Sequence, residues 1–318
     1  MRYAMRADTD PDACLTRIKG EALEAGAEHF RNELVEPSAR NSGTVKIFTL
    51  GRFSIAINGE ALREKGKAKH RPLGLLKTLI ALGGRDVASS RLCEYLWPDS
   101  EADLAARSLT VTVHRLRSML RENMVLIQHD GKLTLNEKIC RIDIWDFERL
   151  VNAGLCKIGD SIAGDGAEMQ LRAALALYAG DFLSRESEES WMLVPRLRLK
   201  TKFERLVLAL SDRFERQKRH TETVDLNLQA LGLDPLNELL YRRLMNSYLK
   251  RSEFSSVLRT YQRCREALTK GLAASASEET QRLYFEALRA ASQSVAHVDT
   301  SSPRVQVRHQ TMEKQSVV

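Results

Sequence analysis

Apolar and polar residues alternate from Val45 to Leu62, in the segment VKIFTLGRFSIAINGEAL, and this alternation indicates β-strands. The pair Asn58-Gly59 inside this run is typical of a two-residue hairpin turn. Segments with apolar residues at helical spacing follow, and they predict helices over 72–82, 90–96 and about 102–120.

A second strand pair is expected in the segment MVLIQHDGKLTLNEKICRIDIW, where two strand-like pieces flank His129-Asp130-Gly131-Lys132. Together these elements predict a compact α+β domain of about 100 residues, which we place at residues 45–145. Residues 1–44 form an N-terminal extension that we expect to be partly helical or disordered, with one amphipathic helix at about 11–34.

Residues 146–291 have apolar positions at a spacing of 3.6 and few β-branched runs, which predicts an all-α domain. An offset of 33–34 residues relates parts of this region, and it is typical of tetratricopeptide-like (TPR-like) helical hairpins. The matching residues are Leu206, Leu210 and Phe214 with Leu240, Leu244 and Tyr248, and Val224 with Val257. The periodicity is lost over residues 292–318, which we expect to form a disordered tail.

Composition places the chain among globular proteins, because 43% of its 318 residues are hydrophobic and 29% are charged. The net charge is +7, and residues 45–121 alone hold 14 basic and 7 acidic residues. A local excess of this kind suits contact with a polyanion, although many globular proteins are mildly basic. We expect no secretory signal and no transmembrane helix, and we therefore expect a cytoplasmic protein.

The predicted helix at 102–120 has one apolar face and one polar face. Its apolar stripe consists of Leu109, Val113, Leu116 and Leu120. On the outward face guanidinium groups, hydroxyls and a valine methyl could contact phosphates and base edges, and the residues are Arg107, Thr110, Val111, His114, Arg115, Arg117 and Ser118. Taken alone, the helix is more typical of an ordinary surface helix with solvated charges.

The neighbours of this helix favour nucleic-acid recognition. A two-helix unit precedes it, a β-hairpin with Lys132 near its tip follows it, and a basic run lies at 63–71. This arrangement is that of a winged helix-turn-helix, in which the helix enters the major groove and the hairpin reaches the backbone. Phosphate contacts are then expected from Lys67, Lys69, His70, Arg71 and Lys132.

Particular motifs resemble a known family. The segment Trp97-Pro98-Asp99 and a wing that ends in Cys140-Arg-Ile-Asp143 resemble an OmpR-type winged helix, in the version of the SARP family of bacterial transcriptional activators. Downstream, the block Gly180-Asp181-Phe182-Leu183 and the segment Tyr261–Leu268 resemble the bacterial transcriptional activator domain (BTAD) of that family. The resemblance covers about three quarters of the chain, and the extension 1–44 has no counterpart in it.

The resemblance implies a sequence-specific DNA-binding regulator that activates transcription. It places a loop that contacts RNA polymerase before the recognition helix, with Pro98, Asp99, Ser100 and Glu101. Because one domain makes few base contacts, we expect direct repeats or a homodimer, with the helical repeats providing the protein contact or sensing a signal. The alternative is an interaction scaffold whose basic domain binds nucleic acid without sequence preference.

Other chemistry has little support in the sequence. The histidines show no metal-ligand spacing, and no nucleophile elbow and no phosphate-binding G-x-x-x-x-G-K-[ST] motif are present, so we expect no enzyme activity, no cofactor and no metal. The cysteines form no C-x-x-C pair, and we expect free buried thiols at Cys14, Cys93, Cys140, Cys156 and Cys264. A basic helix end is expected to be solvated at Arg213, Arg216, Lys218 and Arg219.

Overall fold

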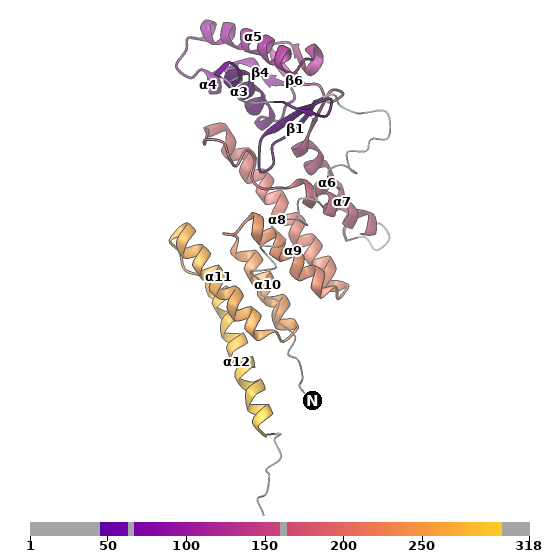
Figure 1. Cartoon of the computed structure of the whole chain (residues 1–318), viewed down its shortest axis with the longest axis vertical. Coiled ribbons are helices and arrows are strands. Elements are labelled where there is room, and N and C mark those ends of the chain that lie inside the picture. The colour runs from indigo at the N-terminus through magenta and orange to yellow at the C-terminus, as the bar shows by residue number, and fades with distance from the viewer. Residues whose placement is uncertain (1–44, 63–66, 160–163, 301–318) are drawn as a thin grey trace, which may run out of the picture. The chain divides into compact units, whose positions relative to one another are not determined.

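The computed structural model of the chain describes residues 45–62, 67–159 and 164–300 (Figure 1). These residues belong to two compact units, which divide after Asp234. The N-terminal extension 1–44, with the helix expected at about 11–34, lies outside the described residues.

A four-stranded sheet begins the first unit, and its strand order is β3-β2-β1-β7. Strand β1 pairs antiparallel with β2 and parallel with β7, so residues 140–142 return to the start of the domain. The predicted turn joins β2 to β3, with positive φ at Asn58 (50°) and Gly59 (86°). The strands are β1 (Val45–Phe48), β2 (Ser54–Ile57), β3 (Glu60–Ala61) and β7 (Cys140–Ile142).

Three helices and a second sheet complete a winged helix. The helices pack on one another, and they are α3 (Lys67–Ala81), α4 (Ser89–Leu96) and α5 (Ala102–Met119). The sheet has the order β4-β6-β5, with β4 (Val87–Ala88), β5 (Leu126–His129) and β6 (Lys132–Leu135). Helix α3 begins five residues before the predicted start, so Pro72 lies inside it and removes one helical hydrogen bond.

Consecutive helices pack as hairpins in the rest of the first unit, α6 with α7 and α8 with α9 (Figure 1). Their bounds are α6 (Asp143–Lys157), α7 (Gly164–Leu177), α8 (Leu193–Arg216) and α9 (His220–Leu233), and a 3₁₀ turn, η3 (Ser190–Met192), precedes α8. An α+β winged helix followed by helical hairpins is the predicted fold class, which is confirmed.

The second unit consists of α10 (Glu238–Lys250), α11 (Phe254–Leu272) and α12 (Glu278–Thr300). Its core contains Met245, Val257 and Ala287, one residue from each helix. The tail predicted to be disordered from residue 292 is helical as far as Thr300. The reason is that no Gly or Pro interrupts the chain between Ala291 and Thr300, so the helix can continue.

The predicted basic helix end is solvated only in part. Arg216 and Lys218 are exposed, as expected, but Arg213 and Arg219 pair with a carboxylate, contrary to the prediction. Arg213 is only 9% exposed, and its Nε donates to Glu168 at 2.8 Å. Arg219 donates to the same carboxylate at 3.0 Å, and its guanidinium lies 4.4 Å from the centroid of the Phe214 ring. Carboxylates on α7 and α9 face these cations across the helical hairpins, an arrangement that spacing along one helix does not reveal.

The four cysteines within the described residues are free, as expected, but only two of them are buried. Burial raises the pKa of the Cys140 and Cys264 thiols to about 12, so both thiols stay protonated at neutral pH. Cys93 is half-buried and Cys156 is exposed. Within the described residues no helix is both long enough and apolar enough to cross a membrane.

The winged helix is joined to the helical hairpins by backbone pairing. Residues 49–51, which follow β1, lie beside residues 181–183, which include most of the distinctive Gly-Asp-Phe-Leu block. The contacts are a β-bridge between Leu50 and Phe182, Gly51 N–H to Asp181 O (3.0 Å), and Leu183 N–H to Thr49 O (2.9 Å). Phe182 and Leu183 are fully buried, so the block is a docking segment for the winged helix.

One buried carboxylate organises this junction. Asp143, the first residue of α6, accepts hydrogen bonds from Thr49 N–H (2.6 Å), Thr49 Oγ1–H (2.6 Å) and Leu50 N–H (2.8 Å). Ile144 N–H donates a fourth bond, at 2.8 Å. Burial raises the pKa of the Asp143 carboxyl, and these hydrogen bonds oppose that rise. The side chain thereby ties the start of the helical region to the loop after β1.

Gly51 and Gly59 form a matched pair that tests how closely the two backbone segments approach at the junction. Gly51 has φ +84°, and a Cβ at this position would lie 2.6 Å from the carbonyl oxygen of Ala179. Gly59 has nearly the same φ, +86°, but nothing lies within 4 Å of its Cβ position. We expect Gly59→Ala to lower the free energy of unfolding by about 1 kcal/mol through backbone strain alone. Gly51→Ala should cost roughly 2–4 kcal/mol, because overpacking adds to that strain.

Chemical denaturation of the two variants measures the difference. Equal losses in the two variants would contradict the close approach of Gly51 and Ala179. A backbone clash cannot be relieved by rotating a side chain. We therefore expect Gly51→Ala to lose more free energy of unfolding than Gly59→Ala at all temperatures below the unfolding transition.

Candidate nucleic-acid interface

Helix α5 packs on α3 and α4 through one face, and its buried residues are Ala105, Leu109, Thr112, Val113 and Leu116. Its N-cap is Glu101, which makes no capping hydrogen bond through its side chain, and Asp103 lies in the first turn near the positive end of the helix. Figure 1 shows α5 along the outer edge of the winged helix, with α3 and α4 on its inner side.

The opposite face of α5 is open to solvent. Arg107, Val111, His114 and Ser118 are exposed and follow one another at i, i+4, i+7 and i+11, so they form a single stripe. Val111 is 50% exposed, so its methyl groups are accessible from solvent. Thr110 and Arg115 flank this stripe and are also exposed. We call these six residues the α5 outer face.

Arg117 does not belong to the α5 outer face, contrary to the prediction. Its side chain is partly buried, and its Nη2 donates to the carbonyl oxygen of Leu126 at 2.8 Å. Leu126 is the first residue of β5, so Arg117 joins the helix to the wing.

The wing is a two-residue hairpin between β5 and β6. Asp130 (φ 46°) and Gly131 (φ 69°) form its turn, as the sequence predicts. Lys132 is exposed beside this turn, and His129 lies 3.1 Å from Asp130. The same hairpin exposes Ile127 (41%), an apolar side chain that the strand alternation in the sequence could have identified.

His70, at the beginning of α3, is an exposed residue of the predicted phosphate-binding set. Arg71 is exposed too, but its Nη1 donates to the carbonyl oxygen of Leu96 at 2.8 Å and its guanidinium lies 6.0 Å from the centroid of the Trp97 ring. Arg71 therefore holds the end of α4, and this contact competes with any contact to a phosphate. The side chains of Lys67 and Lys69 lie outside the described residues.

The loop between α4 and α5 is exposed throughout. Pro98, Asp99, Ser100 and Glu101 are all accessible, and Leu104 in the first turn of α5 is 54% exposed. The loop and this leucine together offer a small acidic and apolar surface.

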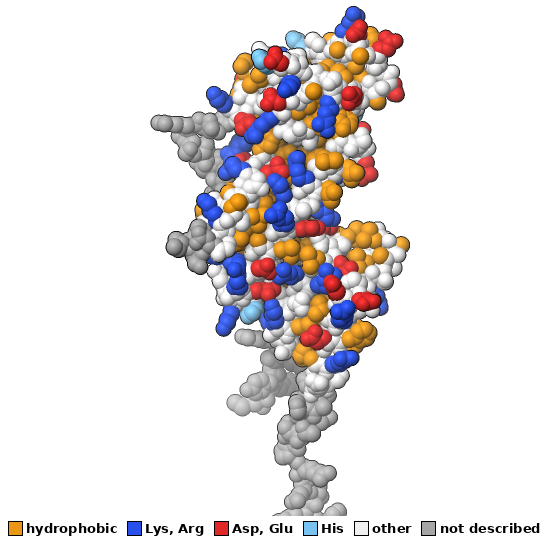
Figure 2. Space-filling view, turned by 180° about the vertical axis from the view of Figure 1, so that it is seen from behind, with side chains coloured by type: hydrophobic (Ala, Val, Ile, Leu, Met, Phe, Trp, Pro, Cys, Tyr) orange, Lys and Arg blue, Asp and Glu red, His pale blue; other side chains and the backbone are white. Residues whose placement is uncertain are grey.

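Charges of both signs lie on the molecular surface. Figure 2 shows Lys and Arg side chains spread over one face, with Asp and Glu side chains between them. Over the described ranges, no group of three or more His, Cys, Asp or Glu side chains is arranged to hold a metal ion.

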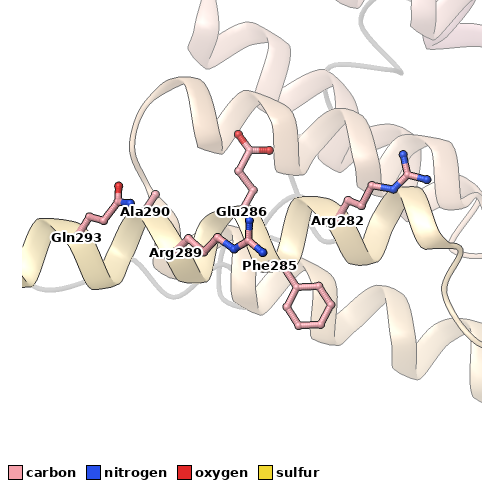
Figure 3. Close-up of a pocket in the computed structure, with 6 residues that line it drawn as sticks. All are labelled: Arg282, Phe285, Glu286, Arg289, Ala290 and Gln293. Carbon is pink, nitrogen blue, oxygen red and sulfur yellow. The ribbon is translucent and has the colours of Figure 1, made fainter.

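Two hollows lie away from α5. One, of about 490 Å³, is lined by α12 alone, and Figure 3 shows Phe285 and Glu286 leaving that helix on opposite sides, so its side chains do not converge. The other, of about 730 Å³, lies between α3 and the segment before α8.

Comparisons with known proteins agree with this architecture. Residues 142–288 match the model of the bacterial transcriptional activator domain. The fold is similar to that of Mycobacterium tuberculosis EmbR, in a complex with a low-affinity phosphopeptide, with a TM-score of 0.58 and 19% sequence identity over 81% of this chain and 70% of that chain. No curated protein matches the sequence significantly. The chain thus joins a winged helix to a region, residues 142–288, that matches the bacterial transcriptional activator domain.

Proposed function

We propose that this regulator binds double-stranded DNA with sequence specificity, through the α5 outer face in the major groove. The observation that carries the proposal is the exposed stripe from Arg107 to Ser118 on a helix whose other face is buried. Arg107 and Arg115 can donate to guanine or phosphate, and the Val111 methyls can contact a thymine methyl. The wing, with Lys132, and the start of α3, with His70, would contact the backbone.

The proposed regulator activates transcription from the cytoplasm, where the chromosome lies. Its exposed loop at residues 98–101 is the proposed contact with RNA polymerase. Because one winged helix makes few base contacts, we propose binding as a homodimer or to repeated sites. We also propose the domain boundaries expected from the sequence, with the winged helix at residues 45–145 and the helical domain at residues 146–291. Backbone pairing joins these two domains.

Selection of bound sequences from a random DNA pool, followed by footprinting at about 150 mM salt, tests the proposal. We expect one enriched site with an affinity at least about 1,000-fold above that for unrelated DNA. The logarithm of the affinity should fall with the logarithm of the salt concentration by about 0.9 per phosphate contact. If the protein instead binds every DNA fragment equally, and this binding weakens with salt, the proposal is overturned. The chain would then be a scaffold that binds nucleic acid nonspecifically.

Transcription in vitro separates the polymerase contact from DNA binding. Alanine at Asp99 and Glu101 should leave the footprint intact and reduce transcript yield severalfold, because both carboxylates are exposed and lie outside the α5 outer face. A normal transcript yield from this variant would exclude the loop as the polymerase contact.

A further inference from the structure

Three apolar side chains are exposed together in the first turn of α8. Leu193, Val194 and Leu197 are 70%, 71% and 65% exposed, and their positions i, i+1 and i+4 place them on one side of the helix. Exposed apolar residues are ordinary when they are scattered singly, but a contiguous group often marks a contact. We call these three residues the α8 apolar turn.

The α8 apolar turn is fixed to the junction of the winged helix and the helical hairpins. Arg196 in the same turn points inward, where its Nε donates to the carbonyl oxygen of Phe182 at 2.9 Å. Its Nη2 donates to the carbonyl oxygen of Leu183, also at 2.9 Å, and the neighbouring Pro195 is buried. The three apolar side chains are therefore presented by a well-anchored turn and not by a frayed helix end.

This anchoring limits the distance from the α8 apolar turn to Val45, where the described chain begins. Val45 lies five residues before Leu50, which forms the β-bridge to Phe182, and Phe182 in turn accepts the hydrogen bond of Arg196. With strands that rise about 3.3 Å per residue, this path places the turn at most about 35 Å from Val45. The chain from Leu34 to Val45 spans up to about 36 Å when extended. A helix that ends at Leu34 therefore reaches the turn of the same molecule.

The segment 11–34 carries an apolar side that matches this turn. It lies outside the described residues, and its sequence predicts an amphipathic helix. In the C-terminal half of that helix Leu23, Phe30 and Leu34 fall at i, i+7 and i+11, on one side. Glycines within the segment lower its helix propensity, so the predicted helix is marginal in water unless its apolar side is covered.

The charges agree with this pairing. The segment holds five acidic and three basic residues, and on the predicted helix Glu24 and Glu33 flank the apolar side. Two exposed arginines, Arg198 and Arg205, follow the apolar turn along α8, and Arg198 is 41% exposed although it pairs with Glu148. Opposite charges thus meet at the edge of the contact, where they favour one orientation more than they add affinity.

We infer that the α8 apolar turn binds residues 11–34 of the same molecule as an amphipathic helix. In this contact Leu23, Phe30 and Leu34 cover Leu193, Val194 and Leu197. The contact gives the N-terminal extension a role at the junction of the two domains, which the proposed DNA binding does not give it. It is measured without DNA, so its failure and a failure of DNA binding are separate results.

Hydrogen exchange of the full chain, followed by mass spectrometry at about 1–50 µM protein, tests the contact. Peptides from residues 11–34 should exchange at least ten-fold more slowly than an unfolded chain of the same sequence, and equally slowly at every concentration. Exchange at the unfolded rate would overturn the inference. Protection that rises with concentration would overturn it as well, because a second copy would then be the partner.

Substitutions on α8 identify the surface. The double variant Leu193→Asp, Leu197→Asp should return the exchange of residues 11–34 to the unfolded rate. Met169→Asp is the matched control and should preserve the protection, since Met169 on α7 is 69% exposed but does not belong to the α8 apolar turn. Because all these side chains are exposed, circular dichroism should show both variants folded. Protection that survives the double variant, or that the control also removes, would exclude this turn as the binding surface.

Substitutions in the segment test the other side of the contact and leave α8 unchanged. Phe30→Asp should raise the exchange of residues 11–34 at least ten-fold, because it places a charge against the α8 apolar turn. Ala25→Asp is its control, since residue 25 lies on the opposite side of the predicted helix, and it should change the exchange less than two-fold. Equal effects of the two variants would show that the segment does not bind through this apolar side, and the inference would be wrong.

Discussion

Replacing Asp143 with alanine is expected to lower the free energy of unfolding by roughly 3–5 kcal/mol. The substitution removes the acceptor of four hydrogen bonds, from Thr49 N–H, Thr49 Oγ1–H, Leu50 N–H and Ile144 N–H. Three of these donors are backbone groups of residues that are at most 2% exposed, so water reaches them poorly. A buried donor without an acceptor costs about 1–3 kcal/mol.

Urea denaturation followed by tryptophan fluorescence measures this loss. All three tryptophans of the chain, Trp97, Trp145 and Trp191, precede Asp234, so the signal reports on the first unit alone. Asp146→Ala is the matched control on the same helix, because its carboxylate pairs with Arg141 and Arg149 near the surface, and we expect it to cost about 1 kcal/mol or less. Similar losses in the two variants would show that the junction does not depend on the buried carboxylate.

The parts of the fold set by neighbouring residues were predictable from the sequence. The turns at Asn58-Gly59 and Asp130-Gly131 follow from residues that tolerate positive φ, and the amphipathic period predicts α5 to within one residue. The junction was not predictable, because Asp143 meets Thr49 across 94 residues of chain. The Gly-Asp-Phe-Leu block was recognised as distinctive, but its role in docking the winged helix depends on that long-range pairing.

Only part of the candidate interface was predictable from the sequence. Periodicity identifies Arg107, Val111, His114 and Ser118 as one exposed stripe. It misplaces Arg117, because the carbonyl oxygen of Leu126 on the wing attracts its guanidinium. A long cationic side chain near the edge of a helix can point to solvent or to a neighbouring strand, and only the neighbour decides between the two.

The double variant Arg107→Ala, Arg115→Ala is expected to bind the selected DNA site about 100-fold more weakly than the wild type. Both guanidinium groups are exposed on the α5 outer face, and each contact to a base edge or phosphate contributes roughly 1–3 kcal/mol to the affinity. Binding to unrelated DNA should weaken much less. Mobility shift and footprinting on the selected site measure the loss, and circular dichroism checks that α5 stays folded.

Arg117→Met separates recognition from support of the wing. We expect this variant to lose about 1 kcal/mol of folding free energy, because the carbonyl oxygen of Leu126 loses its donor while the stem of the side chain stays packed. The part of the DNA site that α5 contacts should stay protected in the footprint. Protection of the DNA at the edge of the site, which the wing contacts, should weaken. If Arg117→Met instead abolished the central footprint while the double variant at Arg107 and Arg115 bound normally, the DNA-binding surface would lie on the wing side of α5. The proposal for the α5 outer face would then be wrong, even though the protein binds DNA.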